Sequence, residues 1–211
     1  MKKNWLEAIL DILAPDKCYY CERIGDAICN DCVEDFTMKQ DGDLFYFESD
    51  QDQSKIRAII DEMKEFSRKA NARGLAKILT KGIRETPELR DDLNKIIFVG
   101  VPTSYKHIRQ RGFCHTSLIL NNLQDLLPIR IGDEIKRVGN LTQIGANRET
   151  RIDQASKSYK LSKTPQKDKI YIVLDDVHTT GATTKNIVRL LRDSGAEKVY
   201  RMVLIVHTNK K

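Results

Sequence analysis

One segment near the end of the chain, residues 171–183, constrains the fold more than any other. Four apolar residues (171–174) predict a buried strand, and two adjacent carboxylates, Asp175 and Asp176, follow at once. Small residues come next, and apolar residues then recur at helical spacing. This order predicts a strand, an acidic strand end, a loop and a helix, which is the repeating unit of an open parallel sheet. Ligands of such sheets bind at the carboxyl ends of the strands, so we expect a binding site here.

The loop at residues 179–183 has the composition of an anion site. Threonine and glycine residues that enter a helix N-terminus leave backbone N–H groups pointing outward, and the helix dipole favours negative charge there. Helix capping alone would explain one aspartate and one threonine. It does not explain two carboxylates followed by Thr-Thr-Gly-Ala-Thr. We therefore expect a ligand with phosphate at one end and with hydroxyl groups or a cation near the other.

The same segment resembles the phosphoribosyl pyrophosphate (PRPP) motif of type I phosphoribosyltransferases: four apolar residues, two acidic residues and a T-T-G-x-T loop. The resemblance implies an α/β fold with a parallel sheet of the type I phosphoribosyltransferase kind, flanked by helices. It also implies that Asp175 and Asp176 are the catalytic candidates, which meet the ribose hydroxyls, and that the loop binds the 5′-phosphate. The loop residues are Thr179, Thr180, Gly181, Ala182 and Thr183.

Four of the five cysteines form two C-x-x-C pairs near the N-terminus, Cys18 with Cys21 and Cys29 with Cys32. Two such pairs can complete a tetrahedral Cys₄ zinc site. Disulfides are the rival interpretation, but they are rare in the reducing compartment expected for this chain. A redox C-x-x-C would need one motif in a thioredoxin-like context rather than two. The spacing favours a small zinc-binding segment whose closed, structural metal supplies its folding energy.

Composition limits the domain organisation and the cellular setting. A chain of 211 residues, 40% hydrophobic and 31% charged, fits one soluble domain with a small addition. We expect a zinc segment at residues 1–40 and the phosphoribosyltransferase-like domain at 41–211. No apolar stretch approaches the ~20 residues of a membrane span. Glu7 and Asp11 interrupt what would be a signal core, so we expect a cytoplasmic protein. The formal charge of +6 allows phosphate-bearing partners.

Hydrophobic periodicity predicts strands that alternate with helices, which indicates a mainly parallel sheet. The expected helices cover residues 3–13, 56–66, 75–83, 116–127 and 182–194. The expected strands cover residues 44–47, 96–101, 135–138, 170–174 and 198–206. Residues 139–158 are polar and lack periodicity, so they read as a long loop of the kind that is functional or disordered.

The cysteine pairs and the PRPP motif together resemble the ComF family, competence-associated phosphoribosyltransferase-like proteins of bacteria. Three further segments agree: Met-Lys-Glu-Phe at residues 63–66, Val-Pro-Thr…Arg-Gln-Arg-Gly-Phe at 101–113, and Gln-x-Gly…Arg…Arg at 143–151. The chain departs from the family at Cys114 and His115, where Asn-Gln is usual, at Ala146, where Leu is usual, and at Gln154, where Asn is usual. If these positions contact substrate, substrate choice or activity differs from the family's.

The ComF resemblance adds further site residues. Together with the resemblance to type I phosphoribosyltransferases, it implies that the loop after the 96–101 strand contacts pyrophosphate, with guanidinium groups that can bind phosphate oxygens bidentately. The residues of this expected contact are Pro102, Thr103, Ser104, Arg109 and Arg111. It also implies a flexible hood that carries Arg148 and Arg151 and closes over pyrophosphate or a nucleic-acid backbone. We interpret His115 and His178 as structural histidines, and Cys114 as a small half-buried residue.

Two functions fit these residues. The first is a phosphoribosyltransferase that uses PRPP with Mg²⁺; no base-recognition segment is recognisable, so the acceptor stays open. The second is a non-catalytic binding or adaptor protein in DNA uptake, in which the zinc segment docks a DNA-processing partner. That partner would be a competence helicase or a recombination mediator, with single-stranded DNA nearby. Fold alone does not decide between the two.

Overall fold

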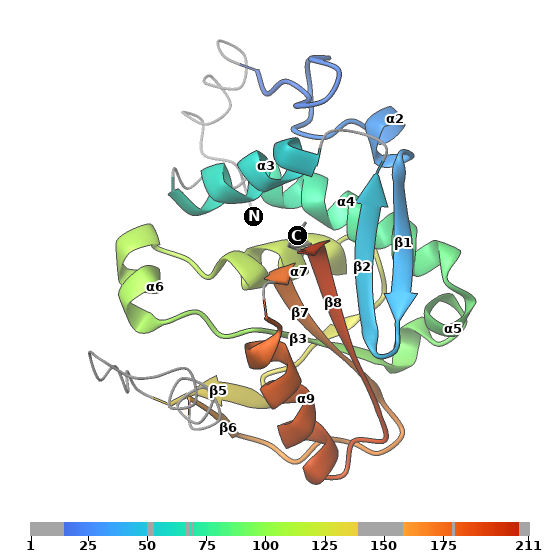
Figure 1. Cartoon of the computed structure of the whole chain (residues 1–211), viewed down its shortest axis with the longest axis vertical. Helices are drawn as coiled ribbons and strands as arrows, with labels where there is room; N and C mark the ends of the chain where they lie inside the picture. The colour runs from blue at the N-terminus through green and yellow to red at the C-terminus, as the bar shows by residue number, and fades with distance from the viewer. Residues whose placement is uncertain are drawn as a thin grey trace.

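The computed structural model describes residues 15–49, 53–65, 68, 70–138, 158–178 and 180–206. Its centre is a six-stranded sheet with the order β1-β2-β8-β7-β3-β4 (Figure 1). β1 runs antiparallel to β2, and all other neighbours are parallel. The strands are β1 (Phe36–Asp41), β2 (Leu44–Ser49), β3 (Ile96–Gly100), β4 (Arg130–Ile131), β7 (Ile170–His178) and β8 (Lys198–Val206). The predicted α/β fold with a mainly parallel sheet is confirmed.

Helices cover both faces of this sheet, and a two-stranded antiparallel ribbon lies beside it. The helices are α2 (Asn30–Val33), α3 (Gln53–Glu65), α4 (Ala70–Glu85), α5 (Pro87–Arg90), the 3₁₀ turn η1 (Leu93–Lys95), α6 (Tyr105–Arg111), α7 (His115–Gln124) and α9 (Ala182–Asp193). The ribbon consists of β5 (Ile135–Arg137) and β6 (Tyr159–Leu161). In the described parts of the chain, no helix has both the length and the apolar composition that a bilayer crossing requires.

Alternation along the central strands divides the core into two layers, because successive side chains of a strand point to opposite faces. Phe98 and Leu174 belong to a large cluster with buried residues of α3, α4 and α7. Val99 and Val173 belong to a second cluster with the apolar stripe of α9. By the same alternation, Asp175 follows Val173 on the side of α9, and Asp176 follows Leu174 on the side of α3, α4 and α7.

The cysteine segment, residues 15–35, packs into the larger of these clusters. Cys18, Cys29 and Cys32 are buried there together with residues of α3 and α4. Gly74 of α4 permits a close approach, since a Cβ at this position would lie 2.9 Å from Cγ1 of Ile28. The segment is therefore anchored on α4 by apolar packing as well as by its cysteines.

Most predicted elements are present, and the differences have local reasons. β1 was not expected, because only the first of its six residues, Phe36, is buried, and a polar edge strand lacks a periodic signal. α6 was not expected either, because none of its residues is buried. The strand β6 was not expected; it begins at Tyr159, directly after the polar stretch 139–158 that reads as a loop. The predicted helix at 3–13 and residues 139–157 of the expected loop lie outside the described residues.

Candidate functional site

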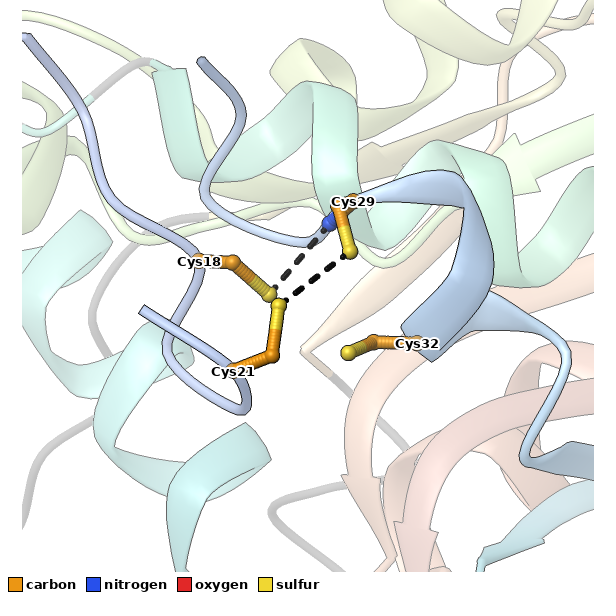
Figure 2. Close-up of side chains that lie close together, drawn as sticks. All are labelled: Cys18, Cys21, Cys29 and Cys32. Atoms are coloured by element: carbon orange, nitrogen blue, oxygen red, sulfur yellow. Dashed lines mark hydrogen bonds between the residues drawn. The ribbon is translucent and has the colours of Figure 1, made fainter. Parts of the chain in front are cut away.

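The four N-terminal cysteines turn their sulfur atoms toward one point (Figure 2). Cys18 and Cys21 lie in a tight turn closed by a β-bridge, and Cys29 and Cys32 flank the start of α2. All four sulfurs lie within 4.8 Å of one another, and those of Cys21 and Cys29 are 3.5 Å apart. Sulfurs around a tetrahedral zinc ion are about 3.8 Å apart, given Zn–S bonds of about 2.3 Å. The predicted cluster is confirmed, and its donor set fits a tetrahedral metal ion.

The protons of this cluster are unevenly held. Burial alone would raise the pKa of the Cys18 thiol, but backbone hydrogen bonds from Cys29, Cys21 and Tyr20 lower it to about 6. Burial and hydrogen bonds with the other sulfurs raise the pKa of Cys32. A metal ion binds thiolates, so binding here would release the remaining protons and replace the hydrogen bonds between the thiols.

Asp175 and Asp176 lie on β7, directly after its buried residues. They occupy alternate positions of the strand, but their carboxylate oxygens come within 4.8 Å of each other. Asp175 continues the row that faces α9 and lines a small pocket with the loop before that helix. The other lining residues are Val177, Thr180, Gly181, Ala182, Thr183 and Thr184. Asp176 continues the row that faces α4 and α7, and only 5% of it is exposed. The two carboxylates therefore have different surroundings, although they are adjacent in the sequence.

The loop before α9 has the backbone geometry of an anion cradle. Gly181 is the N-cap residue of α9 and has a left-handed φ of 66°. The Thr184 hydroxyl donates to the Gly181 carbonyl at 3.1 Å, and the Ala182 N–H donates to the Thr180 hydroxyl at 3.4 Å. Gly181 itself has no side chain that could cap the helix. The first residues of α9 line the same pocket as Asp175, so a phosphate in this pocket could accept from the N–H groups of that turn.

Asp176 is surrounded by basic groups. The Lys64 ammonium of α3 forms an ion pair with Oδ2 of Asp176, and Nε2 of His115 lies 3.7 Å from Oδ1. Burial alone would raise the pKa of Asp176, but His115 and Lys64 hold it well below its ordinary value. Asp176 is thus a buried carboxylate that stays ionised because a lysine compensates its charge.

No lysine of the described residues forms an ion pair with Asp175. Burial and the negative charge of Asp176 raise the pKa of Asp175 from 3.8 to about 7. Its Oδ1 accepts a hydrogen bond from the backbone N–H of Asp176 at 3.0 Å. Near neutral pH Asp176 is therefore ionised, whereas Asp175 is divided between its protonated and ionised forms.

We expect the Asp175→Asn variant to gain stability relative to the parent as the pH rises. The folded pKa of about 7 lies above the ordinary 3.8, so the folded protein holds a proton that the unfolded chain has released. This contribution is complete below the unfolded pKa and is lost as the pH rises through the folded pKa. The difference in unfolding free energy should shift toward the variant by on the order of 1–3 kcal/mol between pH 5 and pH 8. Urea unfolding of both proteins measures it, and a constant difference would contradict the assignment.

The loop after β3 joins the same network. The Val101 N–H donates to the Leu174 carbonyl at 2.9 Å, which holds the end of β3 beside β7. The Thr103 hydroxyl lies 3.4 Å from Nδ1 of His115 and 3.2 Å from the Cys114 sulfur. His115 therefore stands between the predicted pyrophosphate loop and the buried carboxylate. We interpreted it as structural, and the structure adds that it contacts both parts of the site.

Cys114 is more polar in its surroundings than expected. It is the N-cap residue of α7, and its sulfur also lies 3.2 Å from the Thr116 hydroxyl. Burial alone would raise its pKa, but hydrogen bonds with Ser117, Thr103 and Thr116 lower it to about 6. It is half-buried, as the sequence suggested.

The remaining predicted pyrophosphate residues lie on the same loop and on α6. Pro102 and Ser104 flank Thr103, and Oγ of Ser104 accepts from the His107 N–H at 3.4 Å as the cap of α6. Arg109 and Arg111 lie within α6, which stands out from the sheet in Figure 1. Their contact with pyrophosphate stays a prediction. Thr179 of the phosphate loop and Arg148 and Arg151 of the predicted hood lie outside the described residues.

Sequence reasoning assigned no role to Lys64. It lies on α3, before the phosphoribosyltransferase motifs begin, and reaches Asp176 only through the tertiary fold. The one signal was the family-like segment at 63–66, in which a lysine precedes an aromatic residue. That resemblance marked the position but gave no reason for the charge.

A divalent cation at the acid pair needs separate consideration. Ligand atoms of His115, Asp175 and Asp176 lie within 4.8 Å of one another. The Lys64 ammonium already supplies positive charge at Asp176. This ammonium lowers the need for a metal charge at the carboxylate, so we assign no metal to these residues.

Comparisons with known proteins find only distant structural similarities. No protein-family model matches the chain, and no curated protein sequence matches it. Among solved structures, a hypoxanthine phosphoribosyltransferase from Staphylococcus aureus is similar over 74% of this chain and 67% of its own, with 15% identity and a TM-score of 0.36.

Two further structures show the same kind of similarity. A purine phosphoribosyltransferase from Pyrococcus horikoshii covers 78% of this chain and 79% of its own, with 14% identity and a TM-score of 0.30. An allosteric regulatory enzyme of purine biosynthesis matches 68% of this chain with 30% of its own, at 18% identity and a TM-score of 0.44. At these identities and TM-scores the similarity carries no argument, and the function has to be argued from the site.

Proposed function

We propose that this protein binds PRPP at the carboxyl edge of its sheet, in the manner of a phosphoribosyltransferase. The observation that carries the proposal is that Asp175 and the loop before α9 line one pocket at a helix N-terminus. A ligand whose phosphate accepts from those N–H groups would bring its ribose hydroxyls toward the carboxylates. PRPP has this arrangement of phosphate and hydroxyl groups, and a bare phosphate does not.

The chemistry that suits such a site is transfer of the phosphoribosyl group. When the bond from the anomeric carbon to pyrophosphate breaks, positive charge develops on the sugar and negative charge on the leaving group. Asp175 and Asp176 would stabilise the sugar side. The leaving group would be met by the loop at Thr103, by Arg109 and Arg111, and by the hood at 139–158. Mg²⁺ would be held by pyrophosphate and water oxygens, which it prefers to an all-protein cage.

We further propose that the metal of the cysteine cluster is zinc and that the protein acts in DNA uptake, as its resemblance to the ComF family implies. Four thiolates suit zinc, and a closed Cys₄ site has no open position for chemistry. In this proposal the zinc segment is structural. A competence helicase or recombination mediator and single-stranded DNA are the partners that the resemblance implies.

The second candidate is a PRPP-binding adaptor without turnover. One observation favours it: the buried carboxylate Asp176 is already neutralised by Lys64 and lies 3.7 Å from His115, which replaces the usual glutamine. A site compensated in this way can hold a ligand without a developing charge to stabilise. Pyrophosphate release from PRPP, screened with bases and nucleic acids, separates the two candidates.

The test of ligand binding uses calorimetry with PRPP and Mg²⁺. We expect the parent to bind PRPP and the Asp175→Asn variant to bind it ten- to a hundredfold more weakly, because a charge-assisted hydrogen bond is worth about 1.5–3 kcal/mol. Inorganic phosphate should bind the variant as well as or better than the parent, since a nearby negative charge is gone. Unchanged PRPP affinity together with weaker phosphate binding would show that Asp175 only shapes the loop.

A further inference from the structure

Helix α3 lies between the cysteine segment and the carboxyl ends of β7 and β8 (Figure 1). Its apolar side, with Ile59, Ile60 and Met63, is buried in the core. The residues on either side of Met63 in the sequence point to different partners. Glu62 contacts the cysteine segment, and Lys64 contacts Asp176. One turn of helix thus touches both the metal-site segment and the acid pair.

The cysteine segment holds this turn through Tyr19, which follows the first metal-site cysteine. The Tyr19 hydroxyl donates to Oε2 of Glu62, and it accepts from Arg68 at 3.2 Å and from Asn71 at 3.4 Å. Arg68 also donates to Glu62 at 2.9 Å. The tyrosine is therefore the centre of a polar cluster that fixes the last turn of α3 against the segment.

A second contact holds the other end of the helix. The Lys55 ammonium lies 5.6 Å from the centre of the Tyr20 ring. Tyr20 also packs edge-on against Phe36, with ring centres 5.7 Å apart. Two consecutive tyrosines of one C-x-x-C turn thus meet α3 near its start and near its end. The position of α3 depends on the conformation of that turn.

The Lys64 contact matters because of the charge of the proposed ligand. Only 20% of the Lys64 side chain and 6% of the Asp176 side chain are exposed, so solvent screens this pair weakly. Without the ammonium, a buried carboxylate would face an incoming phosphate group without compensation. With it, the net charge of this side of the site is close to zero.

We infer that Lys64 is a positioning residue that compensates and orients Asp176, and that the cysteine segment sets the place of Lys64 through the Tyr19–Glu62 contact. The inference deepens the proposed function and rests on it for the identity of the ligand. The cysteine segment thereby affects the binding site, because a change in the C-x-x-C turn would move the turn of α3 that carries Lys64 and so alter its contact with Asp176. The path consists of side-chain contacts, and no loop motion is required.

A stability experiment tests the inference without any ligand. Lys64→Met and Asp176→Asn are made singly and together, and urea unfolding gives the unfolding equilibrium constants. We expect Lys64→Met alone to change that constant at least tenfold, about 1.4 kcal/mol, and to change it by less than threefold when Asp176 is already asparagine. The same cycle is repeated in Tyr19→Phe protein, where the coupling should fall to less than threefold. Tyr46→Phe is the control, because that hydroxyl makes no hydrogen bond to another described residue.

Calorimetry with PRPP and Mg²⁺ then asks whether the contact serves binding. Lys64→Met should weaken PRPP binding at least tenfold, and Lys64→Arg should restore it to within threefold of the parent. The control is Lys81→Met, because Lys81 is a similarly covered lysine on α4 that pairs with Glu85 away from the site. If Lys64 acted only through overall stability, Lys64→Met and Lys81→Met would weaken PRPP binding alike. Weaker binding in Lys64→Met alone, restored by Lys64→Arg, would show that the positive charge at this position serves binding.

Each outcome decides a separate step. Independent effects of Lys64→Met and Asp176→Asn would overturn the role of Lys64. Coupling that persists unchanged in Tyr19→Phe protein would overturn the role of the cysteine segment. Equal loss of PRPP binding in Lys64→Met and Lys81→Met would show a general loss of stability. If the parent itself does not bind PRPP, the proposed function fails, and the stability cycle still decides the inference.

Discussion

Replacing Cys32 with serine is expected to remove the metal and most of the stability of the N-terminal third of the protein. Cys32 is 7% exposed and belongs to the same core cluster as residues of α3 and α4. Structural zinc contributes about 10–16 kcal/mol of apparent binding free energy in small zinc modules. Loss of one ligand leaves three thiols around a vacated centre, and we expect the unfolding free energy to fall by several kcal/mol, on the order of 3–5.

The fifth cysteine supplies a matched control for this experiment. Cys114→Ser makes the same chemical change at a half-buried residue that lies outside the cluster. Elemental analysis of protein purified without chelator should find one zinc per chain in the parent and in Cys114→Ser, and much less in Cys32→Ser. Thermal unfolding should separate the two variants in the same order. A parent without zinc would overturn the assignment of the metal, and a stable, zinc-loaded Cys32→Ser variant would overturn the ligand set.

The second large effect is expected at Gly181. Its φ of 66° is in the left-handed region, which a β-branched residue adopts only with strain. Gly181→Val should therefore move the loop backbone and place two methyl groups beside the N–H groups that face the pocket. We expect PRPP and phosphate binding to fall at least a hundredfold, because several of these hydrogen bonds would be lost together.

A glycine far from the pocket separates strain from binding. Gly42, in the turn between β1 and β2, has a φ of 57°, and a Cβ there would have no atom within 4 Å. Gly42→Val should lower the unfolding free energy by a similar amount, and its affinity for PRPP and phosphate should equal that of the parent. Phosphate binding by Gly181→Val at parental strength would show that the cradle lies elsewhere. Equal loss in both variants would show that the effect is general strain.

The sequence predicted those parts of the fold that have strong local signals. The buried run of β7, the small loop and the stripe of α9 follow one another without interruption, and each has its own periodicity. The cysteine cluster was predicted from spacing alone. β1 and α6 were not predicted, because β1 has a single buried residue and α6 has none. Such segments are formed by their neighbours: β1 by its pairing with β2, and α6 by a serine cap at one end and Gly112 at the other.

The site was predicted less completely for a different reason. The motif alone does not distinguish Asp175 from Asp176. Strand alternation gives them different neighbours and therefore different pKa values. Alternation could have been applied to the motif before the structure was known. The ion pair with Lys64 could not, because it joins residues that are distant in the chain and depends on where α3 crosses the sheet.

The strand order has a consequence for synthesis on the ribosome. The early hairpin of β1 and β2 takes its place in the sheet by pairing, through Leu44 and Phe45, with β8, the last strand of the described residues. While the chain is still emerging, one edge of β2 has no partner, and exposed strand edges invite pairing with other chains. This edge of β2 stays without its partner until β8 has been synthesised and has emerged from the ribosome. A chain that stops short of residue 198 would therefore leave the hairpin of β1 and β2 without its neighbour in the sheet.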